Sequence, residues 1–130
     1  MATLGDSLYA YLHQHPGLSA LVGKSIYPTR MPQAPDLPAI VYHQIARRPV
    51  HVKKGYVNPI VDVLMQFDVL AKTYTELEAV AAELKRALYG YKVTSPHIYD
   101  VMVEGERDGD EIDLRQFHRS IDCSIWLAEE

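Results

Sequence analysis

Residues 61–90, VDVLMQFDVLAKTYTELEAVAAELKRALYG, carry the two clearest folding signals in the chain, and the second begins where the first ends. In the first part, apolar side chains occupy every second position, which is typical of a β-strand with one buried face. We therefore expect a strand over residues 60–71. The side chains expected on its buried face are Val61, Val63, Met65, Phe67 and Val69.

The second part of this stretch predicts an amphipathic helix. Thr73 and Glu76 form a capping box, in which each side chain accepts a hydrogen bond from the backbone N–H of the other residue. A second box at Thr75 and Glu78 leaves open a start two residues later. Gly90 is expected to close the helix in the left-handed conformation that glycine adopts easily. The apolar face of this helix consists of Tyr74, Leu77, Ala81, Leu84 and Leu88.

The region before this stretch predicts helices and then a proline-rich loop. Apolar residues at helical spacing indicate an amphipathic helix over residues 3–14, which Pro16 stops, and one further helical turn that ends at Gly23. Residues 26–28 are expected to be extended. Four prolines within residues 28–38 then favour a loop, because each fixes its own φ and disfavours helix in the residue before it.

Three further segments, residues 39–45, 97–105 and 115–127, have the alternation of β-strands. Arg119 interrupts the apolar face of the last segment, so we expect it near a strand end or a partner. The expected order is therefore α-β-β-α-β-β. It predicts an α+β fold in which an antiparallel β-sheet has two main helices packed on one face. The apolar faces of the last two strands are Tyr99, Val101 and Val103, and Phe117, Ile121, Cys123, Ile125 and Leu127.

Length and composition exclude several classes of protein. We expect residues 1–130 to form a single domain, because a chain of this length buries enough surface for one core. The formal net charge of -4, from 13 Lys+Arg and 17 Asp+Glu, argues against a general nucleic-acid binder. One cysteine excludes an intramolecular disulfide. No apolar run approaches the roughly 20 residues that cross a bilayer, and the N-terminus lacks the pattern of a signal peptide.

The sequence contains no recognisable catalytic or cofactor motif. A nucleophile elbow, a P-loop, a dinucleotide-binding glycine pattern and a zinc-protease histidine pair are all missing. Cys123 lies within an apolar strand face, where a thiol is usually an inert core residue. The six histidines are scattered and fit surface or interface positions, and Gly109 stands second rather than sixth in the nearby acidic run, unlike a calcium loop. We expect no enzymatic activity, no cofactor and no metal site.

Charge is concentrated in two hairpins of opposite sign. Residues 46–59 join two predicted strands and carry no acidic residue, and we call them the basic hairpin. Residues 104–113 join the last two strands through the turn signal Asp108-Gly109, and we call them the acidic turn. The candidate interface residues are Arg47, Arg48, Lys53, Lys54 and Tyr56 in the basic hairpin, and Glu106, Asp108, Asp110 and Glu111 in the acidic turn.

Two interpretations of these hairpins stay open from the residues alone. Hairpin tips are solvated and tolerate charge, and charge at a sheet edge also discourages aggregation. The alternative hypothesis is a head-to-tail contact between copies, because opposite patches on one protomer suit a heterologous interface that closes into a ring. Complementary charge then sets the register and the choice of partner.

Residues 8–45, LYAYLHQHPGLSALVGKSIYPTRMPQAPDLPAIVYHQI, combine a helix, the LSALVG turn, the IYP extended piece and a proline-rich loop that leads into a strand. This block, and the strand and helix of residues 61–90, resemble the tail completion proteins of long-tailed bacteriophages and prophages. These are also described as tail terminator or head–tail joining proteins. The final pair of strands fits more loosely.

The resemblance implies an α+β fold and a mechanical role without enzymatic activity. Such proteins form rings, usually hexameric, that cap the finished tail tube and dock it to the head connector. The implied partners are further copies of the chain, the tail tube protein and the connector protein, while DNA passes through the lumen without specific binding. The implied location is the virion tail, and the host cytoplasm during assembly.

Three alternatives remain at this stage. One is a head-closure protein of the same general fold. Another is a nucleic-acid-binding module that uses the basic hairpin, with Tyr56 as a stacking platform. The last is a small hydrolase or metal-dependent enzyme built from scattered histidines and acids. We favour a protein partner for the basic hairpin, because a lumen that passes DNA should avoid tight phosphate binding.

Overall fold

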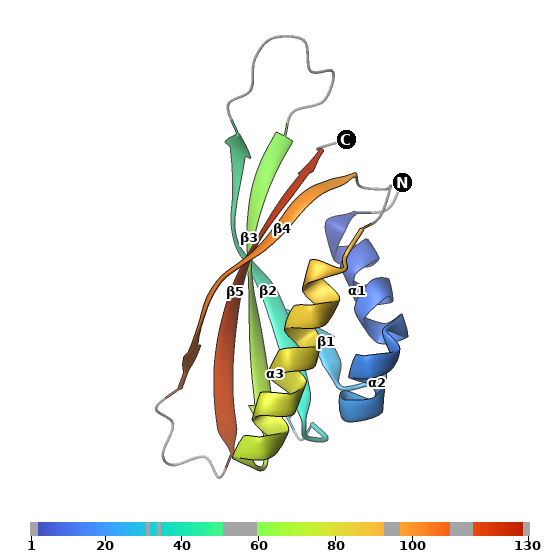
Figure 1. Ribbon diagram of the computed structural model, residues 1–130, viewed down its shortest axis with the longest axis vertical. Coiled ribbons are helices and arrows are strands. Elements are labelled where there is room, and N and C mark those ends of the chain that lie inside the picture. The colour runs from blue at the N-terminus through green and yellow to red at the C-terminus, as the bar shows by residue number, and fades with distance from the viewer. Residues whose placement is uncertain are drawn as a thin grey trace.

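The computed structural model describes residues 3–30, 32–33, 35–50, 60–92, 97–109 and 116–128. Within these ranges, three helices lie on one side of a twisted five-stranded sheet (Figure 1). The helices are α1 (Leu4–Gln14), α2 (Pro16–Val22) and α3 (Tyr74–Tyr89). The strands are β1 (Ile26–Pro28), β2 (Ala39–Val50), β3 (Ile60–Ala71), β4 (Ile98–Asp108) and β5 (Phe117–Ala128). They follow the spatial order β1-β2-β3-β5-β4, so β3 is the central strand.

The central strand and the long helix agree with the sequence prediction. β3 spans residues 60–71 as expected, and its five predicted core side chains are all buried. Thr73 caps α3, because its Oγ1 accepts a hydrogen bond from the Glu76 N–H at 3.1 Å. The prediction of a left-handed conformation at Gly90 is wrong. Its φ of -89° lets its N–H donate to the carbonyls of Arg86 and Ala87, each at 3.2 Å, so the last turn tightens without a left-handed residue.

The N-terminal region contains two helices, where the sequence predicted one helix and one further helical turn. Pro16 opens α2, where the missing N–H of proline costs no hydrogen bond. The His15 side chain caps this helix by accepting from the Leu18 N–H at 3.4 Å. α2 ends at Gly23, which has a positive φ of 59°. The predicted extra turn ending at Gly23 is therefore confirmed, and it forms a helix of its own.

The prediction of an antiparallel sheet holds for four strands and is wrong for the fifth. β1 pairs with β2 in parallel, with Ile26 opposite Ile40, so the sheet is mixed. The observed order is α-α-β-β-β-α-β-β, which adds α2 and β1 to the expected order. β1 covers only three residues of β2. As a result, the part of β2 beyond Tyr42 lies at an edge of the sheet.

Two strands are longer than predicted because β-bulges preserve pairing across polar residues. β2 continues to Val50 past a bulge between Gln44 and Ala46. β4 continues to Asp108 past irregularities near Tyr99 and Glu104. Glu106 and Asp108 therefore lie in a strand and not in a turn, and Tyr99 is displaced from the buried face and is 47% exposed. Phe117, at the start of β5, is also exposed rather than buried.

The core lies between the helices and the inner face of the sheet. The half-buried Tyr11 and the buried Tyr91 connect α1 to the C-terminal end of α3 and to the residues just after it. Tyr11 Oη donates to the Ala87 carbonyl at 2.7 Å, and Tyr91 Oη donates to Ser7 Oγ at 2.7 Å. None of the helices in the described ranges has both the length and the apolar character needed to span a membrane.

Candidate interaction surfaces

The basic hairpin begins in the last residues of β2, at one end of the sheet. Arg47 and Arg48 are exposed strand residues, opposite Val63 and Asp62 of β3. Arg48 Nη2 lies 3.1 Å from Asp62 Oδ2, so this arginine is partly neutralised within the chain. The other predicted residues of this surface, Lys53, Lys54 and Tyr56, lie outside the described residues.

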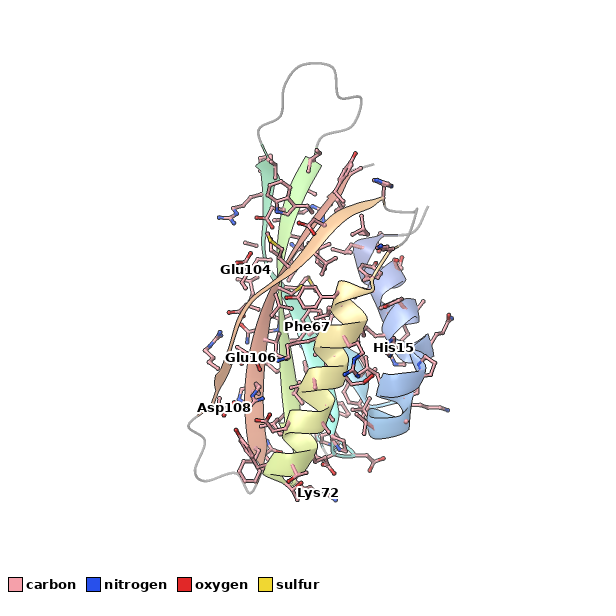
Figure 2. The ribbon with its side chains drawn as sticks, in the orientation of Figure 1. His15, Phe67, Lys72, Glu104, Glu106 and Asp108 are labelled. Carbon is pink, nitrogen blue, oxygen red and sulfur yellow. The ribbon has the colours of Figure 1, made fainter. Side chains whose placement is uncertain are left out.

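Glu106 and Asp108 of β4 lie toward the other end of the sheet, where α3 begins, and Glu104 lies nearer the middle of the sheet (Figure 2). Figure 2 labels Glu104, Glu106 and Asp108 along this strand. Asp110 and Glu111 lie outside the described residues. The described parts of the basic and acidic surfaces therefore lie toward opposite ends of one sheet, and the structure does not bring them together within one copy.

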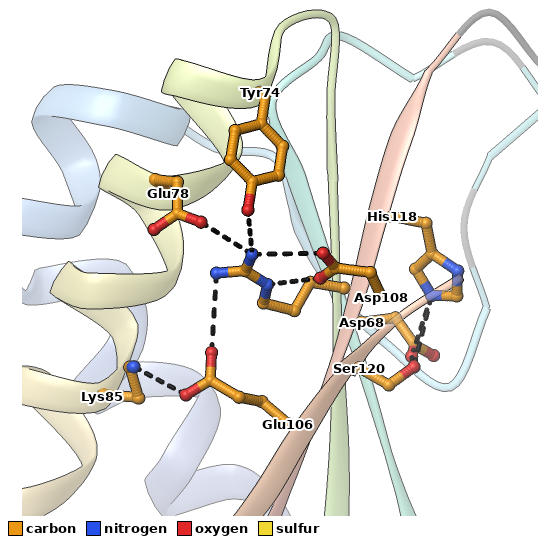
Figure 3. A network of polar contacts seen from close by, with 9 residues as sticks. Asp68, Tyr74, Glu78, Lys85, Glu106, Asp108, His118 and Ser120 are labelled. Carbon is orange, nitrogen blue, oxygen red and sulfur yellow. Dashed lines mark hydrogen bonds and ion pairs between the residues drawn. The ribbon is translucent and has the colours of Figure 1, made fainter. Parts of the chain in front are cut away.

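Glu106 and Asp108 are held by a buried arginine (Figure 3). Arg119 is 8% exposed and lies on the inner face of β5. Its Nε donates to Asp108 Oδ1 at 2.6 Å, and its Nη1 lies 3.5 Å from Glu106 Oε1. Its Nη2 donates to Glu78 Oε1 at 2.7 Å and to the Tyr74 hydroxyl at 3.2 Å. This arrangement ties β4 to the first turns of α3.

Hydrogen bonds favour the charged forms of Arg119, Asp108 and Glu78. Hydrogen bonds to Asp108 and then Glu78 raise the pKa of Arg119. The Arg119 hydrogen bond is the main reason that the pKa values of Asp108 and Glu78 are both lowered. Lys85 Nζ binds Glu106 Oε2 at 2.6 Å, so three carboxylates meet two cations and one negative charge remains. Arg119 interrupts the apolar face of its strand, and the prediction that it lies near a partner is confirmed by its ion pairs with Glu78 and Asp108.

A serine, a histidine and an aspartate meet on the sheet face that the helices leave uncovered. Ser120 Oγ donates to Asp68 Oδ1 at 2.6 Å, and His118 Nε2 lies 3.2 Å from the same oxygen. A catalytic triad needs the serine on one ring nitrogen and the carboxylate on the other. Here both groups approach Nε2, and the Ser120 hydroxyl donates its hydrogen bond to the Asp68 carboxylate rather than to the ring nitrogen. Burial raises the pKa of Asp68, but hydrogen bonds from Ser120, Gln66 and His118 outweigh it and lower that pKa overall.

Cys123 is a core residue, as predicted. It is fully buried in β5, and burial, followed by the nearby Glu104 charge, raises the pKa of its thiol to about 12. A thiol in this environment is protonated at neutral pH and does not act as a nucleophile. Across the described ranges, no three His, Cys, Asp or Glu side chains are placed to hold a metal ion.

The sequence matches the family described as tail completion protein gp17 over residues 6–128, which is nearly the whole chain. The chain belongs to this family. The resemblance first recognised in residues 8–45 and 61–90 is therefore confirmed. None of the curated proteins is a significant match.

Solved structures share the fold of this tail completion family member. A chain from a structure of the virion of a native gene transfer agent particle aligns with a TM-score of 0.67 and 16% identity, over 96% of this chain and 92% of that one. A second structure aligns with a TM-score of 0.51 and 13% identity, over 99% of this chain and 98% of that one. At these identities the similarity establishes the fold.

Family membership makes this chain a structural phage tail protein that works among other structural proteins of a virion. Several of the described ion pairs join different elements of the fold. Arg119 in particular connects three elements, β4, β5 and α3.

Proposed function

We propose that this protein forms a ring, of six copies, at the end of the tail tube. In this role it stops tail growth and joins the tail to the head connector, and DNA passes through the lumen without specific binding. The tail completion family supports the proposal, since completing a tail requires a subunit that binds the tube end and prevents further addition. The gene transfer agent virion supplies a related fold from within a phage-like particle.

The observation that carries the ring proposal is the separation of charge along the sheet. Arg47 and Arg48 lie at the end where β2 and β3 meet the basic hairpin, and the acid-rich cluster around Arg119 lies toward the opposite end. Charges of opposite sign at opposite ends of one copy suit a head-to-tail contact, in which the basic end of one copy meets the acidic end of the next. A ring results when successive head-to-tail contacts close.

The test is charge reversal in the basic hairpin, followed by compensation in the acidic turn. Lys53→Glu with Lys54→Glu should weaken assembly, measured by light scattering and sedimentation, and reversal of Asp110 and Glu111 to Lys in the same chain should partly restore it. Asp108 is unsuitable for this reversal, because it binds Arg119 within its own copy. Unchanged assembly of the doubly reversed basic hairpin would show that this surface does not join the copies.

A further inference from the structure

Two exposed aromatic side chains lie against each other at the end of the sheet where α3 begins. Tyr74 is the first residue of α3 and is 48% exposed, and Phe117 is the first residue of β5 and is 45% exposed. Their ring centroids are 5.9 Å apart and their planes are inclined by 70°, which is an edge-to-face contact. Single exposed apolar residues are common on protein surfaces, but adjoining aromatic rings are typical of interfaces with other proteins.

Arg119 holds one ring of this pair in place. Its Nη2 donates to the Tyr74 hydroxyl at 3.2 Å, and its guanidinium carbon lies 5.8 Å from the centre of the tyrosine ring. Arg119 is itself buried and bound to Asp108 and Glu78, so the whole support is part of the folded structure (Figure 3). A side chain that is already ordered loses little conformational entropy when a partner binds. The pair is therefore a preorganised aromatic surface of the kind that forms binding hot spots.

The charges beside the aromatic pair favour a cationic partner. The side chains of Glu78 and Asp108 are each 49% exposed, although both bind Arg119. A carboxylate oxygen accepts more than one hydrogen bond, so both groups can accept from a second partner. Lys72 and Glu76, which lie next to the start of α3, cancel in charge, and the cluster around Arg119 keeps its one negative charge. Arginine and lysine bind both carboxylates and aromatic rings, so this surface suits a segment that presents them beside apolar side chains.

We propose that the pair of Tyr74 and Phe117 is the surface that receives the basic hairpin, residues 46–59, of the next copy. The inference rests on the proposed ring and names the surface on which its basic end docks. The hairpin sequence, ARRPVHVKKGYVNP, places two arginines and two lysines among valines and a tyrosine, and it has no acidic residue. These are the cationic and apolar side chains that half-exposed carboxylates and adjoining aromatic rings bind.

The hairpin that meets this surface comes from another copy, because the two lie at opposite ends of the sheet. Residue pairing places Val50 opposite Ile60 and Phe117 opposite Ala71. Ile60 and Ala71 are the first and last residues of β3, so roughly 35 Å separates the described end of the basic hairpin from the aromatic pair. A head-to-tail contact between copies brings these two ends together. The aromatic pair then adds apolar contact to an interface whose charges set the register.

The first test adds a synthetic peptide with the sequence of residues 46–59 to the full-length protein. Binding is followed through the aromatic side-chain resonances of Tyr74 and Phe117. We expect saturable shifts of these resonances below about 1 mM peptide, and weaker binding as salt is added. A peptide with glutamine in place of its arginines and lysines should bind about tenfold more weakly or worse. The proposal is overturned if no saturable shift appears, if the shifts spare both rings, or if the glutamine peptide binds equally well.

The second test removes one ring of the pair. Phe117→Ala should weaken binding of the basic peptide by about fivefold or more, as expected for an interface hot spot, whereas Phe117→Tyr keeps an aromatic ring and should retain binding. Tyr89→Ala is the matched control, because Tyr89 is the last residue of α3, at the other end of that helix, and is 58% exposed. It should leave peptide binding unchanged. Equal peptide affinity in Phe117→Ala and Tyr89→Ala contradicts the aromatic site.

Assembly of the full-length protein separates this site from the ring. Phe117→Ala should weaken assembly measured by sedimentation, and Tyr89→Ala should not. Peptide binding at Phe117 in a protein that forms no ring, alone or on tail tubes, supports the contact between the hairpin and the aromatic pair but refutes the ring. Rings that form as well with Phe117→Ala as with wild type, from a protein that does not bind the peptide, overturn the aromatic site and leave the ring in place.

Discussion

Replacement of Arg119 by methionine should destabilise the protein far more than the same replacement of Arg107. Both arginines bridge β4 and β5, but on opposite faces of the sheet. Arg119 is buried on the helix side and binds Asp108 and Glu78, whereas Arg107 is exposed and binds Asp122 at 2.7 Å. Methionine keeps most of the aliphatic packing of either side chain, so the comparison isolates the charged head.

The expected size of the effect follows from burial. Removing one partner of a fully buried ion pair costs about 3–5 kcal/mol, because the remaining charge is left without a partner. Here the Asp108 side chain is 49% exposed and regains water, so we expect about 2 kcal/mol for Arg119→Met. For Arg107→Met we expect about 0.5 kcal/mol, typical of an exposed pair. In a chain of this length these values correspond to melting temperatures lower by roughly 8 °C and 2 °C.

The pH dependence of the difference in melting temperature between wild type and Arg119→Met provides a second test of the same contact. Arg119 lowers the pKa of Asp108 and Glu78 in the folded state, so its contribution to stability is complete above about pH 4, the usual carboxylate range. This contribution to stability is lost as the pH falls through the lowered pKa values of Asp108 and Glu78. Melting curves of wild type and Arg119→Met should therefore converge in acid. Equal melting temperatures for Arg119→Met and Arg107→Met at pH 7 would refute this account of the cluster.

Two further predictions concern single residues of α3 and β5. Thr73→Ala removes the hydrogen bond to the Glu76 N–H and should lower the free energy of unfolding by about 1 kcal/mol, measured by urea denaturation, whereas Thr75→Ala should cost much less because Thr73 is the cap. Cys123 should resist a thiol reagent such as iodoacetamide at pH 8 in the folded protein and react readily in urea, because burial raises the pKa of its thiol to about 12. Rapid labelling of the folded protein would contradict the core assignment.

Elements with strong local signals were predictable from the sequence. β3 and α3 follow period-two and helical patterns closely, and Thr73 marks the start of the helix through a local hydrogen bond. The ion-pair role of Arg119 was foreseeable as well, because a guanidinium on an apolar strand face requires nearby acids. What the sequence left undetermined was which acids supply it, since Glu78 and Asp108 lie on different elements.

Features that depend on distant pairing were not predictable. The parallel pairing of β1 with β2 involves three residues and has no pattern of its own. The bulges near Ile45 and Glu104 shift the alternation of side chains, so the strands continue where the pattern had ended. A pocket beside Tyr42 was not predicted, because most of its lining residues come from α1, the end of β1 and β2, which are separate in the sequence. The Tyr42 hydroxyl, which is buried without a hydrogen-bond partner among the described residues, was not predicted either, because no sequence pattern indicates whether a buried hydroxyl has such a partner.

The most direct test of the central proposal is electron microscopy of the purified protein mixed with polymerised tail tubes. A subunit that completes the tail should add a ring of density at one end of each tube and stop further growth when free tube protein is supplied. A monomer in dilute solution agrees with this proposal, since the tube can template the ring. Tubes whose ends remain bare and continue to lengthen in the presence of excess protein would contradict it.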